Sequence, residues 1–396
     1  MINEKMRLLG ANRSVIRELF EYGKKRKSEI GEEKVFDFSL GNPSVCAPKE
    51  VSENLIKLIE EENPISLHGY TSAQGDKGVR DAIAAYVNER HLTSYNGDCF
   101  YMTVGAAAAL TCSLTALVCP GEEVIVLSPY FPEYRVFVER CGGVLREVLC
   151  ESESFQPDID AIREAINEKT AAIIINSPNN PTGAVYTEES LIKLSNLLSE
   201  YETKYKRSIY IICDEPYREL GYDGVKVPFI PKIYKNTVVS YSFSKSLSLP
   251  GERIGYCLVP DTADNNEAVY SAIAGAGRAL GFVCAPSLLQ KLIPHCLGKT
   301  ADITVYNKNR TILFDSLTSY GFKAVKPDGA FYLFLKAPDG DSVKFCEAAK
   351  KKEILVVPSD SFGCSGYVRI AYCVDTELIE RSLDAFRALA EEYGLI

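Results

Sequence analysis

Short apolar runs alternate with helical patterns through the middle of the chain. Runs typical of buried strands occupy 124–127, 171–175, 209–213, 238–241 and 254–259. Between and before them, 106–118 and 191–201 carry apolar residues at helical spacing. Because strands alternating with helices are typical of parallel sheets, the pattern predicts a mostly parallel α/β sheet covered by helices.

The two ends of the chain have a different pattern. Residues 331–335 and 368–372 are expected to be strands, and a long final helix should begin near Thr376. A chain of 396 residues is long enough for two domains. We therefore predict a large α/β domain at 46–290 and a smaller α+β domain built from 1–45 and 291–396.

The composition is that of a soluble globular protein, with 46% hydrophobic and 24% charged residues. The net charge of −9 does not favour binding to nucleic acid or to an anionic membrane. The basic run at 24–27 lies near the end of an expected helix, where a solvated helix end is favoured over a binding patch. No apolar stretch approaches the roughly 18 residues that a membrane span needs.

The 13 cysteines are scattered without a CxxC pair, and several lie in apolar stretches. This usage favours reduced thiols in a cytoplasmic protein over a disulfide framework or a zinc site. The N-terminus lacks an apolar signal core. The three histidines, His68, His91 and His295, do not group, so no metal site or histidine triad is predicted.

Lys245 has the most informative surroundings in the chain. It lies in Ser242-Phe243-Ser244-Lys245-Ser246, after the apolar run 238–241, and Arg253 follows eight residues later. Its amine could form a Schiff base with a carbonyl cofactor, while the hydroxyls and the guanidinium hold a phosphate. From this segment alone, an ordinary surface lysine is an equal alternative.

Two more polar segments follow predicted strands, at the sheet edge where open α/β sheets bind ligands. Asp214 follows 209–213 and could pair with a protonated ring nitrogen, or equally could cap a helix. The segment 176–183, Asn-Ser-Pro-Asn-Asn-Pro-Thr-Gly, follows 171–175. Its prolines and glycine fix a rigid turn, which favours a site loop presenting Asn180 over a plain loop.

Two weaker signals lie at the same edge. Gly105, Ala106 and Ala107 follow an expected strand near 100–103 and open a helix, whose free N–H groups could hold a phosphate. Phe131 lies just past 124–127 and could stack on a cofactor ring, although an isolated aromatic residue there is more often part of the core.

In their order and spacing, these segments resemble the fold-type I pyridoxal-phosphate enzymes, specifically the class I/II aminotransferases. The most specific matches are Asn180-Pro181-Thr182-Gly183, Asp214-x-x-Tyr217 and Ser242-x-Ser244-Lys245 with Arg253. The resemblance runs from Gly41-Asn42-Pro43 to Arg369, nearly the whole chain. It implies an aspartate-aminotransferase-like enzyme that uses pyridoxal 5′-phosphate to move an amino group between an L-amino acid and a 2-oxo acid by a ping-pong mechanism.

The resemblance also implies roles at the cofactor. Lys245 would be the Schiff-base lysine and general base, and Asp214 would pair with the pyridine nitrogen. The phenolic oxygen of the cofactor would be bound by Tyr217 and Asn180. Phe131 would stack on the ring. The groups expected to hold the phosphate are Ser242, Ser244, Arg253 and the backbone at Gly105, Ala106 and Ala107.

Further roles concern the substrate and a second subunit. Arg369 resembles the arginine that grips the substrate α-carboxylate, and Gly41 would lie beside that carboxylate. Asn180 would contact the substrate as well as the cofactor. Tyr70 matches the tyrosine that reaches the phosphate of the neighbouring subunit, which implies a homodimer with shared active sites.

The sequence departs from the family pattern in places that bear on the substrate. Pro358-Ser359 stands where Pro-Gly is usual, and some aspartate aminotransferases carry a lysine where this chain has 106–109, all alanine. Arg278 lies near the place where dicarboxylate-specific members have an arginine for the distal carboxylate, and a structural role is equally open. Aspartate is the first expected substrate, and aromatic amino acids and alanine stay open.

Other functions are compatible with the same motifs. A carbon–sulfur β-lyase, or an enzyme like aminocyclopropane-carboxylate synthase, would share the cofactor residues. A ligand-sensing regulator would carry a DNA-binding domain, for which the segment before Gly41 is expected to be too short. We therefore predict an enzyme that acts on small molecules.

Overall fold

The computed structural model describes residues 2–11 and 14–396. Residues 1, 12 and 13, which fall in the expected segment 1–45, lie outside the described residues. One sheet has seven strands in the order β2-β8-β7-β6-β5-β3-β4. Their bounds are β2 Phe100–Thr103, β3 Glu123–Ser128, β4 Val144–Leu149, β5 Thr170–Asn176, β6 Tyr210–Asp214, β7 Thr237–Ser242 and β8 Gly255–Leu258.

The seven-stranded sheet is mostly parallel, as predicted. Strand β8, expected as 254–259, is the exception because it runs antiparallel to both of its neighbours, β2 and β7. The other neighbouring pairs are parallel. The register places Asn176 opposite Asp214 and Asp214 opposite Ser240, so the polar ends of three strands meet at one edge.

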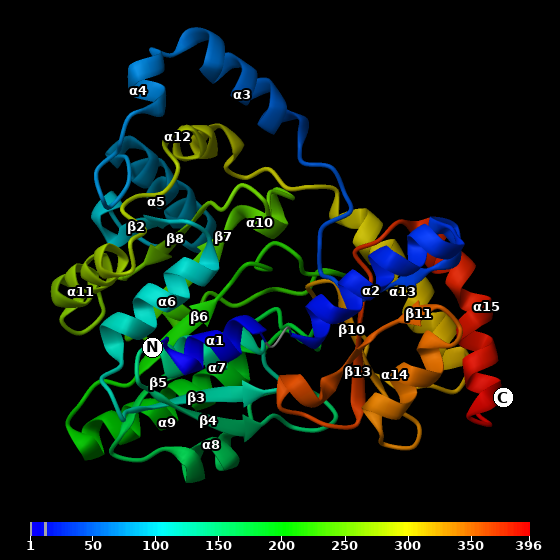
Figure 1. Cartoon of the computed structure of the whole chain (residues 1–396). Helices are drawn as coiled ribbons and strands as arrows, with labels where there is room; N and C mark the ends of the chain where they lie inside the picture. The colour runs from blue at the N-terminus through cyan, green and yellow to red at the C-terminus, as the bar shows by residue number, and fades with distance from the viewer. Residues whose placement is uncertain (1, 12–13) are drawn as a thin grey trace.

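Helices cover both faces of this sheet (Figure 1). Successive residues of β5 point to opposite faces, so that Ile173 packs into one apolar core and Ile174 into the other. Burial on both faces explains why the strand is a continuous apolar run. Helices of the first core are α5 Lys77–His91, α8 Ile159–Ala165, α9 Glu188–Tyr205 and α12 Ser287–Cys296. Helices of the second core are α6 Ala106–Leu117, α7 Glu133–Arg140 and α11 Asn266–Ala279.

A third core lies around a smaller antiparallel sheet, in the order β12-β13-β10-β9. Its strands are β9 Lys323–Ala324, β10 Tyr332–Lys336, β12 Val357–Pro358 and β13 Tyr367–Ala371. Helices α13 Ile303–Ser319, α14 Ser342–Lys350 and α15 Thr376–Glu392 pack with it, on the right of Figure 1. The parallel pair β1 Phe36–Asp37 and β11 Ile354–Leu355 joins the two ends of the chain.

The remaining helices lie at the periphery. Helix α2 Val15–Ile30 lies beside the smaller sheet, and the shorter α1 Glu4–Ala11 precedes it. Helices α3 Lys49–Glu61 and α4 Pro64–His68 pack on α12 at the top of Figure 1. The short helix α10 Phe243–Ser246 directly follows β7 and therefore carries Lys245 at the polar edge of the large sheet.

Candidate active site

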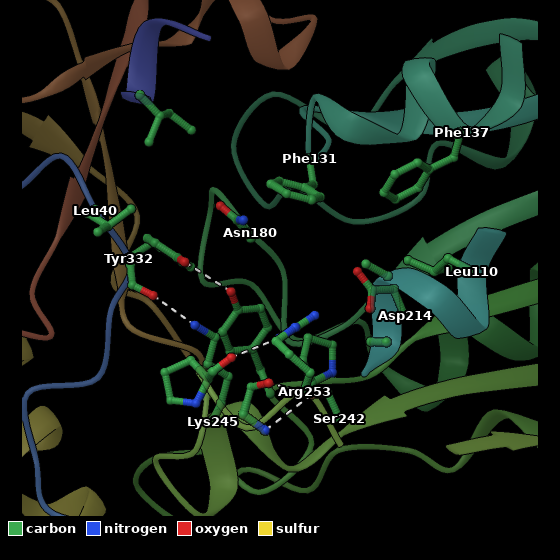
Figure 2. Close-up of a pocket in the computed structure, with 18 of the residues that line it drawn as sticks. Leu40, Leu110, Phe131, Phe137, Asn180, Asp214, Ser242, Lys245, Arg253 and Tyr332 are labelled. Atoms are coloured by element: carbon green, nitrogen blue, oxygen red, sulfur yellow. Dashed lines mark hydrogen bonds between the residues drawn. The ribbon is translucent and has the colours of Figure 1, made fainter. Parts of the chain in front are cut away.

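A cavity of about 270 Å³ lies at the edge where the parallel strands end. Figure 2 shows Lys245, Ser242 and Arg253 grouped in the lower part of this cavity, with Asp214 to one side. The predicted site residues that line it are Gly41, Ala106, Ala107, Phe131, Asn180, Asp214, Tyr217, Ser242, Ser244, Lys245, Arg253 and Arg369. Segments far apart in the sequence are thus brought to one site.

Lys245 points into the cavity rather than into solvent. Its Nζ donates a hydrogen bond of 2.8 Å to the carbonyl oxygen of Gly41. Burial lowers the pKa of Lys245 to about 8, because an ammonium group loses hydration there. The surface-lysine alternative is therefore wrong, and burial makes the amine easier to deprotonate than an exposed lysine.

Asp214 ends β6 and is buried. Its Oδ2 accepts a hydrogen bond of 2.5 Å from the hydroxyl of Tyr134, and Asn176 Nδ2 donates 2.8 Å to its backbone carbonyl. Within the described chain, Asp214 Oδ1 has no partner. Burial raises the pKa of Asp214 to about 7. The helix-cap alternative is wrong, because the side chain bonds a tyrosine hydroxyl of another element.

Asn180 and Arg369 are joined across the cavity. Nη1 of Arg369 donates 3.1 Å to Asn180 Oδ1, and Nη2 donates 2.6 Å to the carbonyl of Ser39. The guanidinium lies 4.7 Å from the ring centre of Tyr332 and 5.2 Å from that of Phe362. Contacts with two rings and two hydrogen bonds restrict the orientation of the guanidinium, whose planar fork suits bidentate recognition of a carboxylate.

An anion cradle forms where α6 begins. Gly105 has a φ of +88° and precedes α6, and an added Cβ there would lie 2.8 Å from Nη2 of Arg253. The hydroxyls of Ser242 and Ser244 are 2.6 Å apart. Backbone N–H groups at a helix start, two hydroxyls and a guanidinium together are suited to a phosphate.

Gly255 on β8 holds this cradle together. A Cβ added at Gly255 would lie 3.1 Å from Cα of Gly105 and 3.2 Å from Cα of Ser242. The two halves of the cradle therefore approach each other across a glycine. Sequence reasoning missed Gly255, because the approach depends on β8 lying between β2 and β7.

Tyr332 is a second residue that sequence reasoning missed. Its hydroxyl lies 2.9 Å from the hydroxyl of Tyr217, and both rings are buried. Tyr217 is thus held at the cavity wall, where the resemblance places it. Tyr332 belongs to the apolar run 331–335, in which nothing in the sequence distinguishes it from a core aromatic residue.

Apolar side chains close the cavity toward the N-terminal segment. Ile16 on α2 and Leu40 line it on that side, and Phe131 and Phe137 line it on the side of α7. Phe131 packs edge-to-face on Tyr134, with ring centres 5.7 Å apart. Ile16, Leu40 and Phe137 were not predicted from the sequence, because single apolar residues carry no signal of a site.

Three predicted residues do not line the cavity of a single chain: Gly105, which lies next to the lining residue Ala106, and Tyr70 and Arg278. Tyr70 is 91% exposed, in the loop after α4. Arg278 is exposed on α11. Tyr70 and Arg278 could therefore contact a molecule bound in this cavity only from a second copy of the chain, and the role given to each stays a prediction.

The turn at Pro358-Ser359 accommodates serine in place of the usual glycine. Ser359 is buried, and its Oγ accepts a hydrogen bond of 3.0 Å from the backbone N–H of Tyr367. The hydroxyl therefore satisfies a backbone donor at the start of β13, the strand that carries Arg369.

Comparisons with known proteins show the family of this chain. The sequence model of the family described as aminotransferase class I and II matches residues 33–386. The aspartate aminotransferase of Thermotoga maritima is 31% identical over 358 residues, 89% of this chain and 90% of the relative. The aspartate/prephenate aminotransferase of Thermus thermophilus is 31% identical over 353 residues, 87% of this chain and 88% of the relative.

A solved structure is similar over the whole chain. The crystal structure of an amino transferase from Eubacterium rectale superposes with a TM-score of 0.98, at 54% identity and 99% coverage of both chains. The expectation of a fold-type I enzyme is confirmed. In the described residues, no helix is both long and apolar enough to cross a membrane. The chain belongs to the class I and II aminotransferase family, which implies pyridoxal 5′-phosphate as cofactor, and it is an aminotransferase.

Proposed function

We propose that this aminotransferase binds pyridoxal 5′-phosphate in the described cavity, with Lys245 as its covalent anchor, and transfers the amino group of L-aspartate to a 2-oxo acid. One observation carries the proposal. Lys245, Asp214 and Arg369 line the same cavity, and Oδ1 of Asp214 has no partner among the described residues.

The residues present fit the cofactor. Asp214 Oδ1 is buried and without a partner among the described residues, as expected of a group that pairs with a ring nitrogen. The cradle at Gly105, Ser242 and Arg253 fits a phosphate. Asn180 Oδ1 is used by Arg369, which leaves the amide Nδ2 to donate to the phenolic oxygen beside Tyr217.

The bound cofactor would supply an electron-withdrawing ring that stabilises negative charge at the substrate Cα. Nζ of Lys245 would accept the proton from that carbon and deliver it to the C4′ carbon of the cofactor. A pKa of about 8 suits this exchange better than the usual 10.5 of a lysine, because the amine then releases a proton more readily. Burial is the main cause of the lowered pKa.

Arg369 would bind the α-carboxylate and so orient the Cα–H bond. Its Nε has no partner within the described chain, although it is buried, and so remains free to donate. Asn180 and Ser39 fix the other two nitrogens. Ile16 and Leu40 would keep water from the reacting carbon on the open side of the cavity.

Aspartate is proposed on the names of the two Thermotoga and Thermus relatives. Among the described residues, the cations that line the cavity are Lys245, Arg253 and Arg369, and each already has a role. The distal carboxylate of aspartate would then need a cation from a second subunit, for which Arg278 is our candidate. Aromatic amino acids and alanine stay as alternatives.

A homodimer with shared active sites is part of the proposal. Ile65 on α4 is 85% exposed, and Tyr70 in the loop after α4 is 91% exposed. Ile56 and Ile59 on the neighbouring helix α3 are also exposed (Figure 1). An exposed apolar surface of this kind is typical of an interface. The single-chain cavity also leaves both Tyr70 and Arg278 without a role.

We also propose a cytoplasmic location and a division of the chain into two domains. A cytoplasmic location is supported by the cysteines, all of which are free. The division into 46–290 and 1–45 with 291–396 is supported by the separate cores of the two sheets. The boundary at 290 falls inside α12, whose Leu292 and Ile293 belong to a core of the large sheet, so we place it after α12.

The experiment is an amino-transfer assay with purified protein, pyridoxal 5′-phosphate, L-aspartate and 2-oxoglutarate. Equal amounts of oxaloacetate and glutamate are expected. Transfer only from aromatic amino acids or alanine would contradict the proposed substrate but keep the activity. Pyruvate release from cystathionine, without a 2-oxo acid and without transfer from any amino acid, would instead indicate a β-lyase.

A further inference from the structure

A buried hydrogen bond next to the cavity joins Asp214 to a residue that the motifs do not include. Tyr134, on α7, is buried, and its hydroxyl donates to Oδ2 of Asp214 on β6 at 2.5 Å. The other oxygen of Asp214, Oδ1, has no partner within the described chain. The two carboxylate oxygens of Asp214 therefore differ: Oδ2 is hydrogen-bonded to Tyr134, and Oδ1 is available to a bound molecule.

We propose that Tyr134 is a positioning residue, which fixes Asp214 with Oδ1 directed at the cofactor and favours the ionised form of the carboxyl group. The proposal rests on the proposed function, because it takes the protonated ring nitrogen of pyridoxal 5′-phosphate as the partner of Oδ1. Tyr134 itself would touch neither the cofactor nor the substrate.

The direction of the hydrogen bond follows from the two groups. Burial, together with the neighbouring charge of Asp214, raises the pKa of Tyr134 well above its usual range, so that the phenol keeps its proton and donates. Burial raises the pKa of Asp214 to about 7, and the bond from Tyr134 opposes this rise. Without that bond, Asp214 would be largely protonated at neutral pH and could not pair with a ring N–H.

Other charged and titratable groups face Asp214, and none replaces Tyr134. Glu215 raises the pKa of Asp214, and it is itself paired with Arg218 through a bond of 2.5 Å from Nε. Among the described residues, the only hydrogen bond that an Asp214 carboxylate oxygen accepts comes from Tyr134. The remaining groups around Asp214 are Cys213 on β6, Tyr217 in the following turn, Tyr332 on β10, and Lys245 and Arg369 across the cavity.

Removing only the hydroxyl is a clean test, because the ring has its own contacts. Tyr134 stacks on Tyr130 with ring centres 6.3 Å apart and packs edge-to-face on Phe131. Tyr134→Phe keeps these contacts. Tyr130→Phe is the matched control, since it removes a neighbouring hydroxyl that bonds Glu147 at 2.5 Å instead of Asp214.

The measurement is the affinity of the apo-protein for pyridoxal 5′-phosphate, by fluorescence or calorimetry, as a function of pH. For Tyr134→Phe we expect affinity about tenfold weaker at neutral pH, since hydrogen bonds to charged groups are worth that much. The pH below which affinity falls should rise by about one unit, because Asp214 then takes up its proton at higher pH. Tyr130→Phe should match the wild type in both quantities.

A double-mutant cycle separates ionisation from packing. In an Asp214→Asn background, where residue 214 does not ionise, Tyr134→Phe should change the pH dependence of affinity very little. An equal loss in both backgrounds would show a packing role and overturn the proposal. If Tyr134→Phe alone is insoluble, the double variant Tyr134→Phe with Asp214→Asn should be soluble, because it buries no unpaired charge. Insolubility of the double variant would also overturn the proposal.

The role of Tyr134 and the proposed function of the protein are contradicted by different results. Wild-type affinity and an unchanged pH dependence in Tyr134→Phe would overturn the role of Tyr134 and leave the proposed function intact. A wild-type protein that does not bind pyridoxal 5′-phosphate would contradict the proposed function itself.

Discussion

Gly41 and Tyr332 approach each other so closely that a Cβ on Gly41 would lie 2.0 Å from the Tyr332 hydroxyl oxygen. The same glycine accepts the hydrogen bond from Lys245 Nζ through its carbonyl. Because Gly41 has no side chain, the segment after β1 can contact both Tyr332 on β10 and the amine of Lys245. A glycine is needed here for space rather than for an unusual φ angle.

Gly41→Ala should therefore impair the site more than the fold. The new methyl group must push Tyr332 away, and with it the hydroxyl contact to Tyr217. We expect kcat/KM to fall by about 100-fold or more, because displacement of a positioning group by about 1 Å has that effect. Steady-state kinetics of the holoenzyme give the answer.

The control for that variant is Gly275→Ala, on α11, where an added Cβ meets nothing within 4 Å. It should keep wild-type kinetics and gain slight stability, because alanine favours a helix. Wild-type kinetics in Gly41→Ala would show that the cavity tolerates the displaced tyrosine, contrary to our account.

Arg369→Lys tests whether planar recognition of a carboxylate matters. Lysine keeps the charge but loses the fork that Asn180 and Ser39 hold. We expect kcat/KM for aspartate to fall by about 100-fold, since two charge-assisted hydrogen bonds are weakened. Arg387→Lys, at a cation lying 5.2 Å from the Tyr320 ring and away from the cavity, should change nothing. An equal, small effect of both substitutions would contradict the carboxylate role.

Lys245 should lower the stability of the cofactor-free protein. Burial lowers its pKa from 10.5 to about 8, which corresponds to about 3 kcal/mol against folding when the amine is charged in both states. Below about pH 8 this cost is fully present. As pH rises toward 10.5, the folded state releases a proton that the unfolded state still holds, so stability rises.

Lys245→Met removes this dependence. Its stability relative to the wild type should be about 3 kcal/mol more favourable at pH 7 than near pH 10.5, measured by urea unfolding of both apo-proteins. Lys291→Met, at a surface position near Glu62, is the control and should show no comparable trend. A constant difference between Lys245→Met and wild type across this range would contradict the lowered pKa.

The sequence was sufficient to predict most of the cavity and six of the seven strands of the large sheet; the edge strand β4 was missed, because most of its residues are not buried and it has no continuous apolar run. Strands such as β5 and β7 are buried on both faces and so appear as continuous apolar runs. Cavity-lining residues follow such strands closely, so position and residue type made Asn180, Asp214 and Lys245 candidates, and the resemblance favoured them over the alternatives. The reversed direction of β8 could not, because strand direction is set by connections and not by composition.

The residues that were missed act through tertiary contacts. Tyr134 and Tyr332 are tyrosines in amphipathic or apolar segments, and only the folded chain shows what their hydroxyls reach. Gly255 matters because the end of β7 and the start of α6 meet over it. Tyr70 and Arg278 were chosen by resemblance, and a single chain cannot bring them to its own cavity.

The most direct test of the account is the visible absorbance of purified protein with pyridoxal 5′-phosphate, for wild type and Lys245→Ala. The wild type should show a protein-bound cofactor band that falls with L-aspartate and recovers with 2-oxoglutarate. Lys245→Ala should remain folded by circular dichroism but lack this cycle. A Lys245→Ala protein that cycles like the wild type, or a wild type that gives no bound-cofactor band, would contradict the assignment of Lys245.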